Sequence, residues 1–145
     1  MGWLIYSGNI DRLQGNRPIG DGDCVDLVQK LTSIGHTSRW QRGPRVVEMA
    51  FLNPGTVIAN FVPDGRGGWK FPNRHGSHAA FFVEFAGRFL NGRQAGIVVM
   101  DQFVNRVPKN EVRARPIPSW GMKSKAEGNM YSDADNADQY FVVMV

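Results

Sequence analysis

The order of elements expected along this 145-residue chain predicts an α+β fold, with N-terminal helices packed on an antiparallel β-sheet of about five strands. Three observations support this prediction. Helical apolar periodicity occurs in the first third of the chain, and runs rich in β-branched and aromatic residues follow after Pro54-Gly55. In addition, 17 Gly and 8 Pro are spread along the chain, as is typical of many short elements joined by tight turns.

The first helix is expected within residues 21–35. Asp21 or Asp23 can serve as its N-cap, and Gly35 suits the position that follows a last helical turn. One face of this helix is apolar, because the i, i+3, i+4, i+7 spacing is found for the apolar residues at positions 24, 27, 28, 31 and 34.

A second, shorter helix is expected over residues 42–52, with Pro44 in its first turn. No internal repeat, low-complexity linker or domain boundary is indicated, so we expect residues 1–145 to form a single domain. Strands are expected at five runs, which are residues 56–62, 78–86, 95–104, 111–115 and 140–145.

Composition limits the class of protein. With 42% apolar and 21% charged residues the chain is not of the disordered type, and its net charge is +4. The N-terminus lacks the basic and apolar regions of a signal peptide, and no run reaches the roughly 18–20 apolar residues of a spanning helix. We therefore expect a protein made in the cytoplasm without a signal peptide and without membrane insertion.

A single cysteine, Cys24, excludes an internal disulfide framework and any zinc site with two or more cysteines. By residue type alone, a lone cysteine on an apolar helical stripe is more often core than reactive. Cys24, however, falls in the first turn of the expected helix, where unpaired backbone N–H groups stabilise a thiolate. The neighbouring Asp23 and Asp26 oppose that effect unless their carboxylates are turned away as caps.

Two polar residues on expected strands complete a possible catalytic set. His78 opens the 78–86 strand, on which Ala79 and Phe81 are expected to point to the core and Ala80 and Phe82 to the other face. Asp101 interrupts an apolar run, where a carboxylate must be paired, and an imidazole N–H is the obvious partner.

Cys24, His78 and Asp101 match the nucleophile, base and orienting acid of acyl transfer. His75 is the main alternative base, although it lies in an expected turn. An oxyanion hole could use the Cys24 backbone N–H together with a side-chain donor, for which Gln102 and Tyr6 are candidates. No metal site and no cofactor are predicted, because the pair of histidines at 75 and 78 and the acidic stretch 133–138 are weak metal motifs.

Three segments carry a family resemblance: GDGDCVDLVQ at 20–29, FPNRHGSHAAFF at 71–82 and GIVVMDQF at 96–103. Together they resemble papain-like amidases of the NlpC/P60 and CHAP type, and among these the type VI secretion amidase effectors. The resemblance runs from about residue 18 to 115. It implies a papain-like fold in which Cys24 is the nucleophile, His78 the base and Asp101 the third residue.

The resemblance also implies an activity, partners and a location. The activity is hydrolysis of amide bonds in peptidoglycan peptide stems, at either the D-Glu–diaminopimelate bond or the diaminopimelate–D-Ala cross-link. The implied partners are the type VI secretion machinery and a cognate immunity protein. The protein would then be secreted and act as an antibacterial toxin in the periplasm of a target bacterium.

Peptide stems carry free carboxylates, which arginines can bind bidentately. Arg74 and Ser77, next to His78, are expected to contact substrate, as are Gln102 and Tyr6. Tryptophans 40, 69 and 120 could line a groove or fill the core. Further candidates for stem carboxylates, each of which could equally be a solvated surface charge, are Arg39, Arg42, Arg106, Arg113 and Arg115.

Two other classes of function remain as alternatives. A basic domain with aromatic residues could bind nucleic acid, but its charge is scattered and that function leaves Cys24, His78 and Asp101 unexplained. A catalytically inactive binding module would instead keep Cys24 buried and unreactive. The enzyme hypothesis is preferred, with peptidoglycan rather than nucleic acid as the partner.

Overall fold

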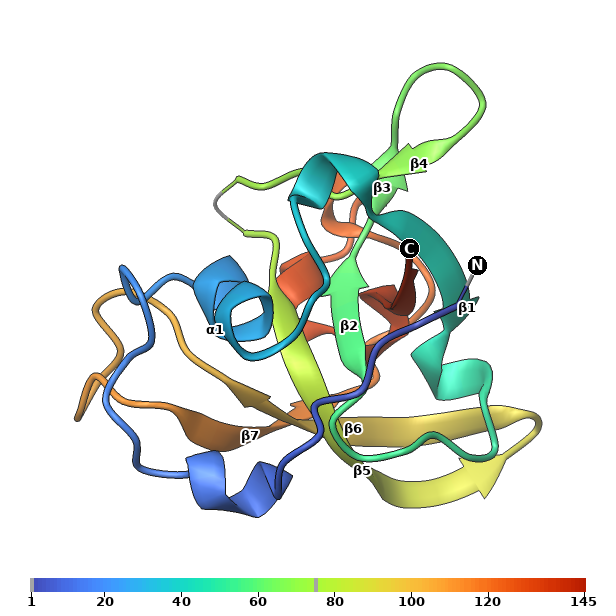
Figure 1. The fold of residues 1–145 in the computed structure, drawn as a ribbon. Helices are drawn as coiled ribbons and strands as arrows, with labels where there is room; N and C mark the ends of the chain where they lie inside the picture. Colours follow the sequence, from blue (N-terminus) through green and yellow to red (C-terminus); the bar gives the residue numbers. More distant parts are fainter. Residues whose placement is uncertain (1, 75) are drawn as a thin grey trace.

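A computed structural model describes residues 2–74 and 76–145 of the chain (Figure 1). Its main feature is a six-stranded antiparallel sheet with the order β1-β8-β2-β5-β6-β7. One α-helix, α1 (Cys24–Leu31), packs on β5. The fold is therefore α+β and dominated by the sheet. Its strands are β1 (Gln41–Arg45), β2 (Val57–Asn60), β5 (Ala79–Leu90), β6 (Arg93–Asp101), β7 (Arg113–Pro118) and β8 (Tyr140–Met144).

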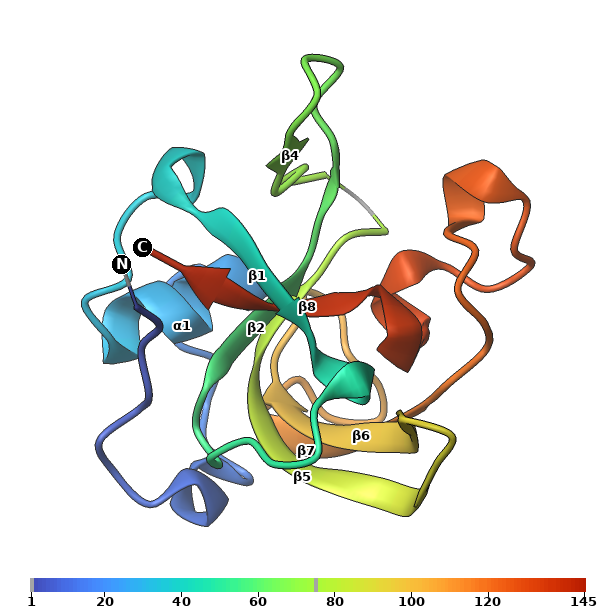
Figure 2. The same ribbon diagram turned by 90° about the vertical axis from the view of Figure 1, so that its right-hand side faces the viewer.

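A separate two-stranded hairpin of β3 (Val62–Pro63) and β4 (Trp69–Lys70) projects from the sheet (Figure 2). The remaining helices are single 3-10 turns. They are η1 (Ile10–Leu13), η2 (Thr37–Arg39), η3 (Val46–Glu48), η4 (Lys125–Glu127), η5 (Asp133–Asp135) and η6 (Ala137–Gln139).

All five expected strands are present, but the second helix predicted over 42–52 is wrong. Residues 41–45 form edge strand β1, and only the 3-10 turn η3 follows it. A Cβ added to Gly43 would lie 2.6 Å from the Val142 carbonyl oxygen, so glycine permits the close approach of β8. Pro44, which lacks an N–H, is tolerated because β1 is an edge strand.

The first helix is shorter than expected. It begins at Cys24 and ends at Leu31, and Thr32 caps its C-terminus with both its N–H and its hydroxyl donating to the Val28 carbonyl. Gly35 is therefore not the residue after the helix, although its φ of +76° does turn the chain.

Both faces of the sheet are buried, which corrects the expectation of one core face. On the α1 side, Ala79 and Phe81 belong to one apolar cluster. On the opposite side, Ala80 and Phe82 belong to a second cluster with strand β6. A bulge between Phe82 and Glu84 shifts the register of β5 against β6. Within the residues that the structure describes, no helix has the length and apolar character needed to cross a membrane.

Candidate active site

Cys24 is the first residue of α1, where its backbone N–H has no partner within the helix. The thiol is free and half-buried. Asp23 is the N-cap, and its Oδ1 accepts the N–H of Asp26 at 3.0 Å. Asp26 Oδ2 in turn accepts the Asp21 N–H at 2.6 Å. Both acidic neighbours of the thiol therefore accept backbone N–H groups, Asp23 as the helix cap and Asp26 from within the first helical turn.

The turn before the helix depends on a glycine. Gly20 has a φ of +62°, and a Cβ there would lie 2.4 Å from Asp26 Oδ2. Any side chain at this position would strain the backbone and displace the carboxylate that holds the turn.

Gln102, which is fully buried at the end of β6, fastens this turn to the sheet. Its Oε1 accepts the Ile19 N–H at 2.7 Å, and its Nε2 donates to the carbonyls of Ile19 and Asp23, each at 2.8 Å. Since Asp23 directly precedes Cys24, the Gln102 amide helps to position the thiol relative to β6.

His78 lies directly before β5 and is buried. Its backbone N–H donates to Asn60 Oδ1 at 2.8 Å, and its carbonyl accepts the Asn60 N–H at 3.0 Å. The Asn60 amide nitrogen donates to the carbonyls of Gln139 and Asp133, at 2.9 and 3.2 Å. Asn60 therefore holds the His78 backbone in register between β2 and the C-terminal segment.

The imidazole of His78 lies between a carboxylate and a thiol. Its Nε2 is 2.7 Å from Asp101 Oδ2. Burial acts to lower the pKa of His78, but hydrogen bonds with Asp101 and with Cys24, and the charges of both, outweigh burial and raise the pKa to about 9. Because Nε2 is engaged by Asp101, Nδ1 is the nitrogen left for the Cys24 sulfur. Such a histidine is an imidazolium at neutral pH and can pair with a thiolate.

Asp101 is fully buried and is held by two arginines. Arg106 donates from one terminal nitrogen to Oδ1 at 2.9 Å, and Arg115 Nε donates to Oδ2 at 3.0 Å. Burial acts to raise the pKa of Asp101, whereas the His78 hydrogen bond and the charges of His78, Arg115 and Arg106 hold it below its usual range. The acid beside His78 is thus kept ionised.

The chain is similar to known proteins along almost its whole length. The domesticated amidase effector 2 (Dae2) family matches residues 5–143. The chain belongs to this family. A relative from Salmonella typhi, a type VI secretion amidase effector 2 protein, is 36% identical over 142 residues, which cover 96% of this chain and 97% of that protein. A solved structure of a type 6 secretion amidase effector 2 (Tae2) matches with a TM-score of 0.79 and 32% identity, over 98% of this chain and 94% of that one.

In this family member the structure brings Cys24, His78 and Asp101 together, but it gives Gln102 a different place from the one expected. Both hydrogens of the Gln102 amide are donated to backbone carbonyls, so none remains for a substrate oxyanion. Tyr6 packs its ring against Phe81, with centroids 5.5 Å apart, and its hydroxyl lies beside Gly8. Among the described residues, no hydrogen bond joins Tyr6 to the Cys24, His78 and Asp101 set.

The expected role of two arginines is also corrected. Arg106 and Arg115, considered above for substrate carboxylates, are bound to Asp101. Arg113 pairs with Glu111 at 3.0 Å. Sequence reasoning missed Arg106 and Arg115 as partners of Asp101, and it missed Asn60 entirely. Asn60 could have been found by the criterion that identified Asp101, because it too is a polar residue inside an apolar strand run.

Arg74 and Ser77 lie in the loop between β4 and β5, where the Ser77 N–H donates to the Arg74 carbonyl at 3.1 Å. Arg74 is exposed and Ser77 is half-buried, and both precede His78 in the chain. The alternative base, His75, lies outside the described residues. Within the described part of the chain, no three His, Cys, Asp or Glu side chains cluster as metal ligands.

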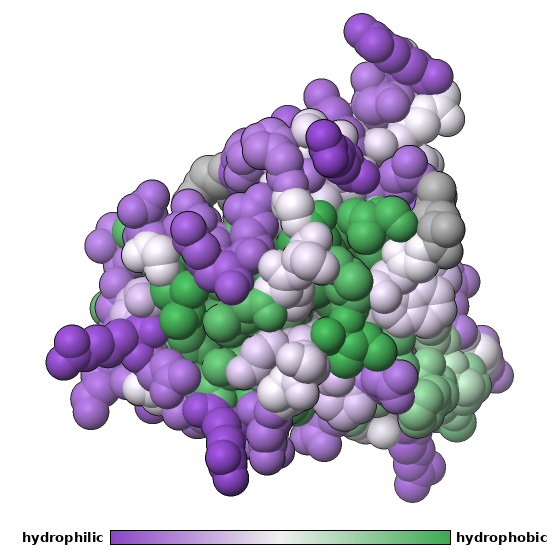
Figure 3. Space-filling model, in the orientation of Figure 1, coloured by the Kyte–Doolittle hydropathy of each residue, from purple (hydrophilic) through white to green (hydrophobic). Residues whose placement is uncertain are grey.

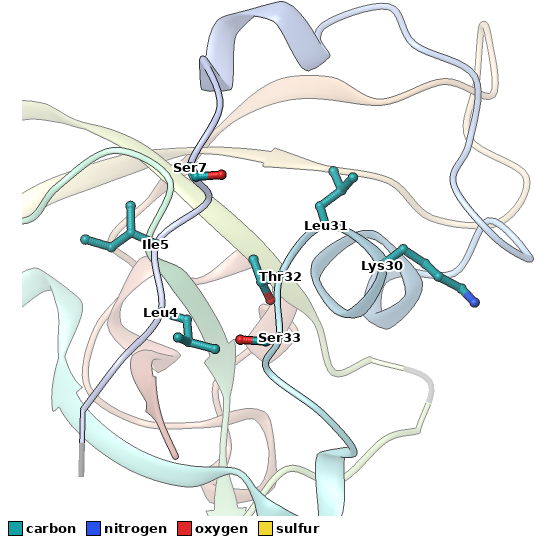
Figure 4. A pocket seen from close by; sticks show the side chains of 7 residues that line it. All are labelled: Leu4, Ile5, Ser7, Lys30, Leu31, Thr32 and Ser33. Carbon is teal, nitrogen blue, oxygen red and sulfur yellow. The ribbon is translucent and has the colours of Figure 1, made fainter.

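A cavity of about 440 Å³ lies at the opposite end of α1 from Cys24, between Leu4 and Ile5 on one side and residues 30–33 on the other (Figure 4). Lys30 points away from it in that view. Apolar side chains gather in the middle of this face of the molecule, within a hydrophilic border (Figure 3). At 1.5 Å rise per residue, the cavity is about 10 Å along the helix from the thiol, so it is not part of the Cys24 site.

Proposed function

We propose that this protein is a cysteine amidase that hydrolyses amide bonds in the peptide stems or cross-links of peptidoglycan. The observation that supports this most directly is the 2.7 Å contact between His78 Nε2 and Asp101 Oδ2, in a histidine whose pKa is also raised by Cys24. In this proposal Cys24 is the nucleophile, His78 the general base and acid, and Asp101 the residue that orients His78.

The first half-reaction forms an acyl-enzyme. The Cys24 thiolate attacks the carbonyl carbon of the scissile amide, and the electron pair of the C=O bond moves to the oxygen. The Cys24 backbone N–H, free of intrahelical partners, is one donor to that oxyanion. The C–N bond then breaks as the His78 imidazolium gives its proton to the departing amine.

The second half-reaction releases the acid. Neutral His78 takes a proton from water, the hydroxide oxygen attacks the thioester carbon, and the C–S bond breaks to regenerate the thiolate and the imidazolium. Asp101 stays ionised throughout and holds the imidazole orientation, a role supported by its two arginine partners.

The proposal extends to the biology that the relatives' names describe. A helix-borne cysteine followed by a histidine and an acid at strand ends fits a papain-like domain of the NlpC/P60 and CHAP type, formed by residues 1–145. We assign the protein as an antibacterial effector carried by the type VI secretion machinery to the periplasm of a target bacterium. A producing cell would need a cognate immunity protein. Arg74 and Ser77 are proposed to contact the peptide stem.

The test is incubation of purified sacculi with wild type and with Cys24→Ala, followed by separation and mass analysis of the muropeptides. We expect cleavage by wild type and a loss of about 10⁴-fold or more in the variant. The product masses identify the bond that is cut. Equal products from both proteins, or no product from wild type, would reject the proposal.

A further inference from the structure

A second hollow, of about 530 Å³, lies between η2 and the β3–β4 hairpin. Its apolar floor is formed by Trp40 and Phe71, which are buried and have ring centroids 5.0 Å apart. Its polar lining includes Thr37 and Ser38. The volume is within the range of about 300–1,000 Å³ that is typical of sites for small ligands.

The most distinctive residue of this hollow is Trp69. The guanidinium of Arg42 lies 3.9 Å from its ring centroid, and 4.9 Å from that of Phe141. Arg42 therefore lies against one face of the indole, yet Trp69 remains 41% exposed. An aromatic ring held by cation–π contacts and still open to solvent is a rigid platform for a ligand.

The charged side chains around Trp69 are of both signs, and hydrogen bonds fix the position of one of them. Arg66 and Lys70 line the hollow together with Asp64. Asp64 Oδ1 accepts the N–H groups of Arg66 and Gly68 at 2.7 and 3.0 Å, and these bonds lower the pKa of Asp64. The Asp64 bonds thus order the tip of the hairpin, and the hollow is lined by charges of both signs, one carboxylate and two cations.

The hollow is connected to the Cys24 site by a short piece of chain. Phe71, in its floor, precedes His78 by seven residues, which can span at most about 25 Å. Figure 1 and Figure 2 both show the hairpin projecting from the sheet on the side where this chain enters β5. The hollow and His78 are therefore within about 25 Å of one another, a distance that a glycan strand with its attached peptide stem can span.

We infer that this hollow, centred on Trp69, binds a sugar ring of the glycan strand to which the peptide stem is attached. The inference rests on the proposed function. A hexosamine has a flat C–H face that stacks on an indole, and hydroxyls that pair with the Thr37 and Ser38 hydroxyls and with charged groups of both signs. That combination matches the exposed indole, the hydroxyl residues and the charges of both signs in the lining.

The experiment compares two substrates for each protein: cross-linked muropeptides that carry their disaccharides, and the same cross-linked peptides released from the glycan. For Trp69→Ala we expect kcat/KM to fall about tenfold on the glycan-bearing substrate and less than about twofold on the free peptides. Trp69→Phe, which keeps a smaller aromatic platform, should retain most of the activity on both. Trp120→Ala is the matched control, because Trp120 is 44% exposed but stacks on Tyr131 elsewhere.

A direct readout uses Cys24→Ala and a tetramer of β-1,4-linked N-acetylglucosamine. Titration followed by NMR should shift the indole N–H signal of Trp69 and leave that of Trp120 in place. Equal losses on the two substrates, or no shift at Trp69, would overturn the inference while leaving the amidase proposal intact. A wild type that cleaves neither substrate would reject the amidase proposal itself.

Discussion

Arg115 donates its Nε–H to Asp101 Oδ2 at 3.0 Å, the same oxygen that receives the His78 hydrogen bond at 2.7 Å. Arg106 takes the other oxygen, Oδ1, at 2.9 Å. A buried carboxylate is tolerated only when it is paired and hydrogen-bonded, and here two cations supply both conditions. Asp101 is thus ionised and fixed in orientation, which in turn fixes the imidazole of His78.

The first prediction concerns Arg115→Met. Removing this cation raises the pKa of Asp101, because the charge of Arg115 helps to lower it. We expect kcat/KM on muropeptides to fall about tenfold at neutral pH, as expected for a displaced orienting group, and the acid limb of the pH profile to move to higher pH. The measurement is the pH dependence of kcat/KM.

The control for that variant is Arg113→Met. Arg113 lies on the same strand, two residues away, but pairs with Glu111. Its pH profile should match that of wild type. If both variants shift the acid limb equally, the effect comes from overall charge and not from the contact with Asp101.

The second prediction concerns stability. Asp101→Asn leaves two arginines beside a neutral group, and breaking a buried ion pair from one side costs about 3–5 kcal/mol. For a chain of this length that lowers Tm by about 10 °C. The folded-state pKa of Asp101 lies below its unfolded-state pKa. The stabilisation by ionised Asp101 is therefore fully present above the unfolded-state pKa and is lost as pH falls through the folded-state pKa. The Tm difference between wild type and variant should therefore shrink in acid.

The third prediction concerns the proton on His78. Cys24 raises the pKa of His78, so Cys24→Ala should lower it from the value of about 9. NMR titration of the imidazole signals measures this directly. The signals of exposed His36, which is paired with Ser38, should not differ between the two proteins. An identical His78 titration in wild type and variant would mean that the thiol does not interact with the imidazole.

The raised pKa of His78 has a consequence for stability as well. The contribution of protonated His78 to the free energy of unfolding is fully present below the unfolded-state pKa of about 6.5. It is lost as pH rises through the folded-state pKa of about 9. The free energy of unfolding of wild type, relative to that of His78→Gln, should therefore decrease across this interval. Urea unfolding at a series of pH values tests it, and a difference that does not change with pH contradicts the assignment.

The fourth prediction concerns Gln102→Leu. The substitution leaves the part-buried Ile19 and Asp23 carbonyls without their amide donor, and a lost hydrogen bond of this kind costs about 1 kcal/mol. Because Asp23 adjoins Cys24, we expect kcat to fall as well as Tm. Gln94→Leu is the matched control, since Gln94 is buried and donates to the Met49 carbonyl. Gln94→Leu should lower Tm without lowering kcat. If Gln102→Leu and Gln94→Leu lower kcat equally, Gln102 does not position Cys24.

Local sequence signals predicted the elements that depend on local interactions. The helix that begins at Cys24 follows from apolar spacing and an aspartate cap. Strands β5 and β6 follow from two β-rich runs, and the structure joins them by the turn Asn91-Gly92, whose φ values are 54° and 77°. The failure at residues 42–52 has a nonlocal cause. Strand β1 exists because β8, about a hundred residues later in the chain, pairs with it.

The amino-acid sequence by itself determined the α+β class, the helix position of Cys24 and the candidates His78 and Asp101, because periodicity, capping and a charge in an apolar run are local signals. Only the tertiary structure decided the partners of those side chains. Arg115 reaches Asp101 through the β6–β7 register, and Gln102 binds a turn 79 to 83 residues away. Such contacts depend on how distant segments pack, so an arginine that could equally face solvent or substrate is instead held by a buried carboxylate.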